Sequence, residues 1–109
     1  MVVRVWHGWT TLELADTYEA LLFDQVIPGI RAKNIPGWLS IQVLRRRRAE
    51  VADEVEFVTL MTFDSWEAVC AFAGDDPERA YVPEAARRVL KRFDERSQHY
   101  EVRDPAISA

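Results

Sequence analysis

The sequence predicts an α+β domain in which the elements follow the order strand–helix–strand–strand–helix–strand. Two observations support this class. Short β-rich segments alternate with segments whose apolar residues recur at helical spacing, and two of the strands follow each other directly around a charged connection. The length of 109 residues is common for one domain. We therefore expect one domain over residues 1–103 and a short C-terminal tail over 104–109.

The N-terminal part of the chain predicts a strand and then a helix. Residues 2–7 are rich in β-forming residues and end at Gly8. Thr10 and Glu13 have the spacing of a capping box, in which both side chains bind free amides at the start of a helix. Pro28 has no backbone N–H to donate, so this helix is expected to kink or restart there. The apolar stripe of the helix consists of Leu14, Tyr18, Leu21, Leu22 and Val26.

The middle of the chain predicts a hairpin. Pro36-Gly37 forms the turn into a strand over 38–46, and a charged connection from Arg47 to Glu54 leads to a strand over 55–63. Asp64 or Ser65 caps the second main helix, and Gly74 ends it.

The remaining segment predicts a short turn at Asp76-Pro77, a helix from Pro83 and a last strand from Gln98 to Arg103. The helix from Pro83 would carry Ala86, Val89, Leu90 and Phe93 on one face. The complete order is that of a ferredoxin-like βαββαβ fold, a four-stranded antiparallel sheet with helices on one face.

Two of the predicted strands are apolar on both faces, which predicts a homodimer. In the third strand Val55, Phe57, Met61 and Phe63 alternate with Val58 and Leu60. The second strand places Leu39, Ile41 and Val43 opposite Trp38 and Leu44. Because helices cover only one face of such a sheet, the other face needs a partner, and a second copy of the chain would supply it.

Composition excludes several classes of function. A net charge of −4 argues against a surface for nucleic acid or for an anionic membrane. No apolar run approaches the roughly 20 residues of a membrane span, and the N-terminus lacks the pattern of a secretory signal. Cys70 is the only cysteine, so no disulfide within the chain and no cysteine-based metal cage is expected. The simplest expectation is a cytoplasmic protein.

Three motifs resemble the antibiotic biosynthesis monooxygenase-like family. They are Arg4-Val5-Trp6-His7-Gly8 with Thr10, Phe63-Asp64-Ser65-Trp66-Glu67-Ala68 with Phe72, and His99-Tyr100-Glu101-Val102. The resemblance covers nearly the whole chain to Arg103 and marks a fold more than a chemistry. It implies a dimeric α/β barrel, in which two ferredoxin-like sheets pack face to face.

The resemblance also implies a ligand between the sheet and the helices of each subunit. The family includes cofactor-independent oxygenases of polycyclic phenols and haem-degrading enzymes. The first-strand position that is asparagine in these enzymes is His7 here, and the stretch from Phe72 to Tyr81 has no histidine. We therefore expect no haem and no other cofactor, because the expected helix supplies no axial imidazole.

His7 is the candidate catalytic residue. Imidazole titrates near neutral pH, and a phenol must lose a proton before it can pass an electron to oxygen without a cofactor. The alternative is a histidine at a strand end that binds a backbone carbonyl or lies at the dimer interface.

The candidate substrate-binding residues are aromatic: Trp6, Trp9, Tyr18, Trp66, Phe72 and Tyr81. Trp9 follows a strand end, where a cavity rim is common, and Tyr81 lies between two helix breaks, where it would form a lid. The alternatives are that the tryptophans are ordinary core, that Tyr18 bonds a backbone carbonyl and that Tyr81 lies on the surface. The expected function is a cofactor-independent monooxygenase of an aromatic or polyphenolic small molecule. The alternative is a non-catalytic dimer that binds a small apolar ligand or has a stress-related role.

Other sites receive less support from the sequence. His99 would lie at the dimer seam, and a metal site made of His7 and His99 lacks a carboxylate or cysteine at a characteristic spacing. The run Arg45-Arg46-Arg47-Arg48 invites a comparison with RNA-recognition domains, but their glycine-containing aromatic signature is missing. Cross-strand pairs with Glu50, Asp53, Glu54 and Glu56 explain the run instead. Gly8 alone cannot form the anion-binding loop of an acylphosphatase.

Overall fold

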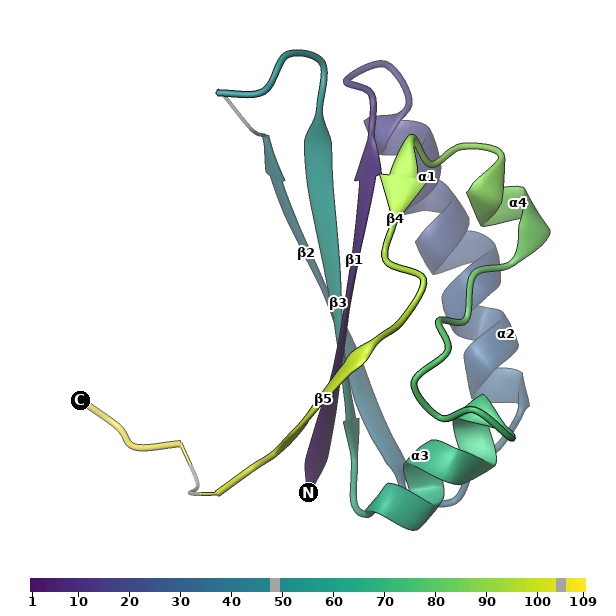
Figure 1. Cartoon of the computed structure of the whole chain (residues 1–109), viewed down its shortest axis with the longest axis vertical. Helices are drawn as coiled ribbons and strands as arrows, with labels where there is room; N and C mark the ends of the chain where they lie inside the picture. The colour runs from purple at the N-terminus through teal and green to yellow at the C-terminus, as the bar shows by residue number, and fades with distance from the viewer. Residues whose placement is uncertain (48–49, 104–105) are drawn as a thin grey trace.

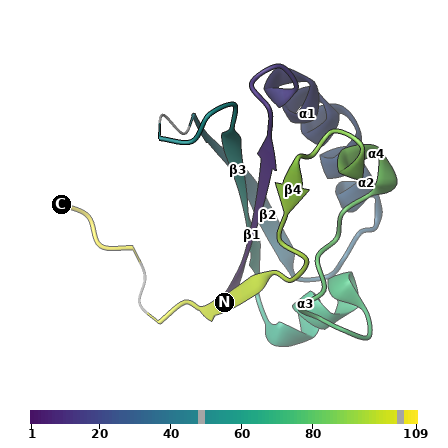
Figure 2. The same ribbon diagram turned by 45° about the horizontal axis from the view of Figure 1, so that its top comes forward.

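An antiparallel sheet forms one layer, and a row of helices covers one of its faces (Figures 1 and 2). The computed structural model describes residues 1–47, 50–103 and 106–109. In the sheet, β2 (Trp38–Arg47) pairs with β3 (Val55–Phe63), and β3 pairs with β1 (Val2–Thr10). Both β4 (Arg92–Phe93) and β5 (Gln98–Glu101) pair with the other edge of β1. This topology confirms the predicted ferredoxin-like fold.

β1 is longer than the sequence predicts. It pairs with β3 over its whole length, from Val2 opposite Phe63 to Thr10 opposite Val55. Gly8 lies inside the strand instead of ending it, because the ring of Trp6 folds over this position and a Cβ there would collide with the ring.

The first helical region is one row made of three segments, α1 (Ala15–Leu21), η1 (Leu22–Val26) and α2 (Ile27–Ala32). η1 is a π-helix, and the amide of Ile27 donates to the carbonyl of Leu22, five residues earlier. Pro28 stands in the first turn of α2, so the predicted restart is confirmed.

The predicted capping box is wrong, because Thr10 is the buried last residue of β1 and its hydroxyl donates to the Thr11 carbonyl. The Thr11 hydroxyl accepts a bond from the amide of Leu14 instead, at 3.3 Å.

The second helical region begins and ends as predicted. Ser65 caps α3 (Trp66–Ala73) by accepting a bond from the amide of Ala68 at 3.2 Å, and Gly74 ends it with a φ of 82°. The helix predicted from Pro83 is wrong in length, since α4 is only Glu84–Arg87. Phe93, which was predicted to lie on this helix, belongs to β4 and pairs with Gly8 of β1.

The two faces of the sheet differ in burial. On the helix-facing side of β3, all five side chains from Val55 to Phe63 at alternate positions are buried. The opposite side, called the open face here, carries half-buried Val58 and Leu60 together with Leu44 and Tyr100, which are 43% and 59% exposed. A register shift between Trp38 and Ser40 places Trp38 on the same side as Ile41 and Val43, so the predicted opposition of these residues is wrong.

The arginine run makes ion pairs in different directions. Arg46 pairs with Glu56 across the hairpin at 2.6 Å, as predicted. Arg45 instead contacts Asp16 and Glu19 of α1, and Glu54 contacts Lys91 and Arg92. Arg48 and the start of the predicted tail at Asp104 lie outside the described residues. Among the described helices, none has both the length and the apolar character to span a bilayer.

The open face predicts self-association through a second copy of the chain. Sedimentation at micromolar concentration should report about twice the chain mass of 12.6 kDa. Leu60→Glu should weaken the dimer by roughly 100-fold, because a carboxylate buried between two sheets costs several kcal/mol. The matched control is Phe23→Glu on the exposed side of η1, which should leave the mass unchanged. A monomeric wild-type protein at this concentration would contradict the prediction.

Candidate functional site

A small cavity of about 40 Å³ lies between the helix-facing side of the sheet and the helical row. The strands contribute Arg4, Trp6, Ile41, Thr59 and Met61, and the helices contribute Tyr18, Leu22, Val26, Ile30 and Phe72. Tyr81, Val82, Pro83, Ala86 and Ser97 complete the lining. About 10–15 Å³ of such space holds one water molecule, so the cavity has room for roughly three.

Trp6 and Tyr18 form the wall nearest α1. The indole Nε1 of Trp6 donates to the carbonyl of Asp94 at 2.8 Å, which fixes the ring. The Tyr18 ring meets Phe57 edge to face, with ring centres 4.9 Å apart. The hydroxyl of Tyr18 forms no hydrogen bond with other described residues, although the side chain is only 1% exposed. Burial raises the pKa of Tyr18, so the phenol stays protonated at neutral pH.

Phe72 and Tyr81 lie where the cavity reaches the surface. Their rings meet edge to face at 5.7 Å, and Tyr81 is 40% exposed. The ammonium of Lys33 stands 4.2 Å from the centre of the Tyr81 ring and 5.2 Å from that of Phe72. Through this cation–π contact Lys33, the residue that follows α2, packs against the mouth of the cavity.

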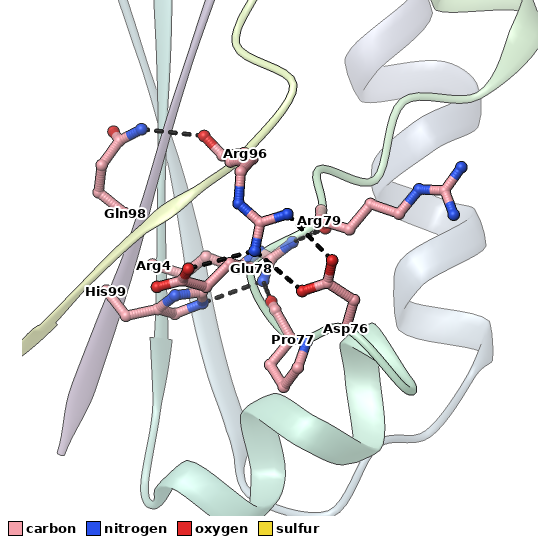
Figure 3. A network of polar contacts seen from close by, with 8 residues as sticks. All are labelled: Arg4, Asp76, Pro77, Glu78, Arg79, Arg96, Gln98 and His99. Carbon is pink, nitrogen blue, oxygen red and sulfur yellow. Dashed lines mark hydrogen bonds and ion pairs between the residues drawn. The ribbon is translucent and has the colours of Figure 1, made fainter.

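Arg4 places a buried positive charge at the cavity wall. Its guanidinium donates to the carbonyls of Pro77 and Arg79 at 2.6 and 2.8 Å, and to Nε2 of His99 at 3.0 Å (Figure 3). The side chain is 3% exposed, and no described carboxylate forms an ion pair with it. Desolvation by burial lowers the pKa of Arg4 to about 10, which still leaves it charged at neutral pH.

His99 is neutral beside this charge. Burial is the main cause that lowers the pKa of His99, and the positive charge of Arg4 adds to it. Because Nε2 accepts from Arg4, the ring proton lies on Nδ1, which is buried without a partner among the described residues. His99 pairs with Arg4 in the sheet and therefore faces the helices, so its predicted place at the dimer seam is wrong.

His7 and Trp9 lie on the open face, away from the cavity. Side chains along β1 alternate between the two faces, and Arg4 and Trp6 occupy the helix-facing positions, so His7 and Trp9 point to the other face. Nδ1 of His7 bonds a carboxylate oxygen of Asp94 at 2.9 Å, and its ring stacks on that of Trp9. Arg92 covers the Trp9 ring at 3.8 Å. The prediction that His7, Trp9 and Tyr18 share one cavity is therefore wrong, and His7 cannot take a proton from a ligand held in it.

The other aromatic candidates divide between cavity and surface. Trp6, Tyr18, Phe72 and Tyr81 line the cavity. Trp66 does not, since it is 44% exposed and its ring meets the edge of His99 at 5.2 Å.

A metal centre does not form among the described residues, where no cluster of three potential ligands occurs. His7 and His99 project from opposite faces of the sheet, so the two-histidine site considered from the sequence has no geometric basis.

The sequence reasoning missed Arg4, Thr59 and Ser97. All three are buried, and the hydroxyls of Thr59 and Ser97 form no hydrogen bond with other described residues. A signal for Arg4 was present, because it stands two residues from Trp6 and two from Val2 on the helix-facing phase of the first strand.

Tyr18 predicts a specific dependence of stability on alkaline pH. Above its ordinary pKa of 10.0 the unfolded chain loses the phenolic proton while the folded chain keeps it. The free energy of unfolding should thus fall by about 1.4 kcal/mol per pH unit from this residue alone. Urea titrations of Tyr18→Phe above pH 10 should show a slope that is smaller by this amount. Equal slopes for the two proteins would contradict the burial of this hydroxyl.

Comparisons with known proteins give similarity in structure only. No family model and no curated protein matches the sequence. A Bacillus cereus protein with a provisional assignment as an antibiotic biosynthesis monooxygenase superposes with a TM-score of 0.64 at 14% identity, covering 98% of this chain and 97% of the other. A Deinococcus radiodurans protein with the same provisional assignment gives 0.62 at 15% identity, covering 100% and 99%.

A third solved structure is a point mutant of MhuD with two manganese protoporphyrin IX molecules bound per active site. It superposes with a TM-score of 0.60 at 20% identity, covering 99% of this chain and 100% of the other. At these identities the likeness is one of fold. The chain thus has the ferredoxin-like fold of antibiotic biosynthesis monooxygenase-like proteins, which confirms at the level of the fold the resemblance seen in its sequence.

Proposed function

We propose that the chain binds a small aromatic or polyphenolic molecule in the cavity between sheet and helices and acts on it as a monooxygenase without a resident cofactor. The observation that carries this proposal is a largely apolar, aromatic cavity lined by the buried Tyr18, whose hydroxyl forms no hydrogen bond with other described residues. Flat rings pack well against Trp6 and Phe72, and a ligand oxygen would give the Tyr18 hydroxyl the hydrogen bond that it lacks. The solved structures of the same fold that carry monooxygenase assignments support the choice of reaction.

The reaction needs no external electron donor. A phenol and molecular oxygen give a quinone and water. One atom of the oxygen molecule becomes the second quinone oxygen, and the other becomes water. The ring hydrogen at the attacked carbon and the phenolic hydrogen leave the substrate and become the two hydrogens of that water. The protein contributes binding, orientation and exclusion of water from the reacting ring.

A ring-sized ligand requires the cavity to open. A dry cavity that binds benzene has a volume of about 150 Å³, several times the closed volume here. Tyr81 and the residues before it form no regular helix or strand, and Tyr81 stands at the mouth. We propose that the outward movement of Tyr81, with loss of its contact to Lys33, admits the ligand.

Haem does not fit the residues of this cavity. Its lining contains no histidine or cysteine within the described part of the chain. Met61 is a thioether, which serves haem iron in partnership with histidine, and burial disfavours the phenolate form of Tyr18.

A second function is favoured by a different observation. The cavity lining contains no carboxylate or imidazole among the described residues, so it offers no ordinary general base. A dimeric protein that sequesters a small aromatic ligand without turnover needs none. Binding with no consumption of oxygen would identify this second function.

Ligand binding and oxygen uptake test the proposal together. A panel of naphthols, hydroquinones and anthrones should include a compound that quenches the tryptophan fluorescence of the protein saturably and consumes oxygen at an electrode. Tyr18→Phe should weaken its binding about two- to tenfold, the effect of one lost hydrogen bond. His7→Gln should change binding and oxygen uptake less than twofold, because His7 lies on the open face. A panel in which no compound binds would overturn the proposed function.

Haem titration tests the exclusion of that cofactor. The Soret band should show no saturable one-to-one shift when haem is added to the protein, because the lining supplies no axial imidazole. A protein that is known to bind haem serves as a positive control for the assay. A stoichiometric complex that converts haem to a ring-opened product would contradict this expectation.

A further inference from the structure

We propose that the ligand of this cavity carries an anionic oxygen, such as a phenolate, an enolate or a carboxylate, and that Arg4 is the residue that binds it. This inference rests on the proposed function, since it names the chemical class of molecule that the same cavity accepts. Arg4 thereby determines specificity for charge, while the aromatic wall accepts the body of the ligand.

The charge of Arg4 lacks a direct counter-ion. The guanidinium has five N–H donors, and its three hydrogen bonds go to two carbonyls and one imidazole nitrogen, all of which are uncharged acceptors. The remaining two donors have no partner among the described residues. Buried charges in proteins are ordinarily paired, so a cation that lines a cavity without a carboxylate is suited to an anion from outside.

Neighbouring carboxylates are engaged elsewhere. Asp76 and Glu78 both bond Arg96, at 3.0 and 3.2 Å, as Figure 3 shows. Their side chains are 49% and 54% exposed, so water screens their charge. His99, which contacts Arg4 directly, is neutral and offers no compensation.

The rest of the lining suits an oxygen-bearing ligand. The hydroxyls of Tyr18, Thr59 and Ser97 line the same cavity without bonds to other described residues. Among the described residues that line the cavity none is acidic, so no carboxylate of the wall itself would face a bound anion. An aromatic anion would place its charged oxygen at Arg4 and its ring against Trp6 and Phe72.

A purely structural role of Arg4 makes a different prediction. Its bonds to Pro77 and Arg79 hold the segment between α3 and α4 against β1, and this tether would act without any ligand. Removal of a tether alters stability and the affinity for all ligands alike. Only a binding role makes the loss selective for anions.

A matched pair of ligands separates these two roles. The probe is 2-hydroxy-1,4-naphthoquinone, which is an anion at neutral pH, and its neutral partner is the 2-methyl ether of the same quinone. Calorimetry or quenching of the tryptophan fluorescence should show the anion binding wild type at least tenfold more tightly. In Arg4→Met this ratio should fall to about one. In Arg103→Met, which removes an exposed arginine that pairs with Glu101 and does not line the cavity, it should be kept.

His99→Glu covers the case in which Arg4→Met fails to fold. It keeps Arg4 and supplies a carboxylate at the position that now accepts its hydrogen bond, so the preference for the anion should disappear. His99→Gln, which is neutral, should keep the preference. Equal binding of the two quinones to wild type, or a preference retained in His99→Glu, would overturn the role of Arg4 while leaving the proposed function in place. Binding of neither quinone, nor of any phenol, would overturn both.

Discussion

The alternation of side chains along β1 is the constraint on which the rest of the structure depends. β1 is paired on both edges, so its register is fixed and its side chains are committed to one face or the other. Arg4 and Trp6 face the helices and form the cavity, whereas His7 and Trp9 face outward. This division decides which side chains of β1 can contact a ligand in the cavity, because residues adjacent in sequence lie on opposite faces of the sheet.

The sequence predicted elements that rest on strong local signals. Ser65 and Gly74 mark the ends of α3 because a cap and a positive φ are requirements of single residues. Pro28 fixed the restart of the helical row for the same reason. The extent of β1 beyond Gly8 was not predictable from local sequence. Glycine at this position makes room for the Trp6 ring, with which a Cβ would collide, and does not end the strand. The short α4 also depends on distant pairing, in which Phe93 joins β1.

Residues of the cavity lining could be inferred from the sequence where a periodic apolar pattern fixed their face. They could not be inferred from the chemical type of the side chain alone. Tyr18 and Phe72 belong to apolar helix faces, and these faces do line the cavity. Imidazole is a common base, which makes His7 a candidate by side-chain type, but adjacent residues of a strand point to opposite faces, so His7 and Trp6 lie on different sides of the sheet. Arg4 was overlooked because charged residues are ordinarily exposed. Its pairing with His99 across β1 and β5 joins positions 95 residues apart, which no local pattern reveals.

Arg4 is also the residue at which stability and function separate. Desolvation by burial lowers the pKa of Arg4 to about 10, so burying this charge is costly for the folded protein. Its three hydrogen bonds to uncharged acceptors offset part of that cost. An apolar side chain at this position would avoid the cost of burying a charge. A cation held in place at the wall of an aromatic cavity is costly without a counter-ion and favourable once an anion is bound. The burial that makes Arg4 costly for folding therefore makes it effective for selecting a ligand.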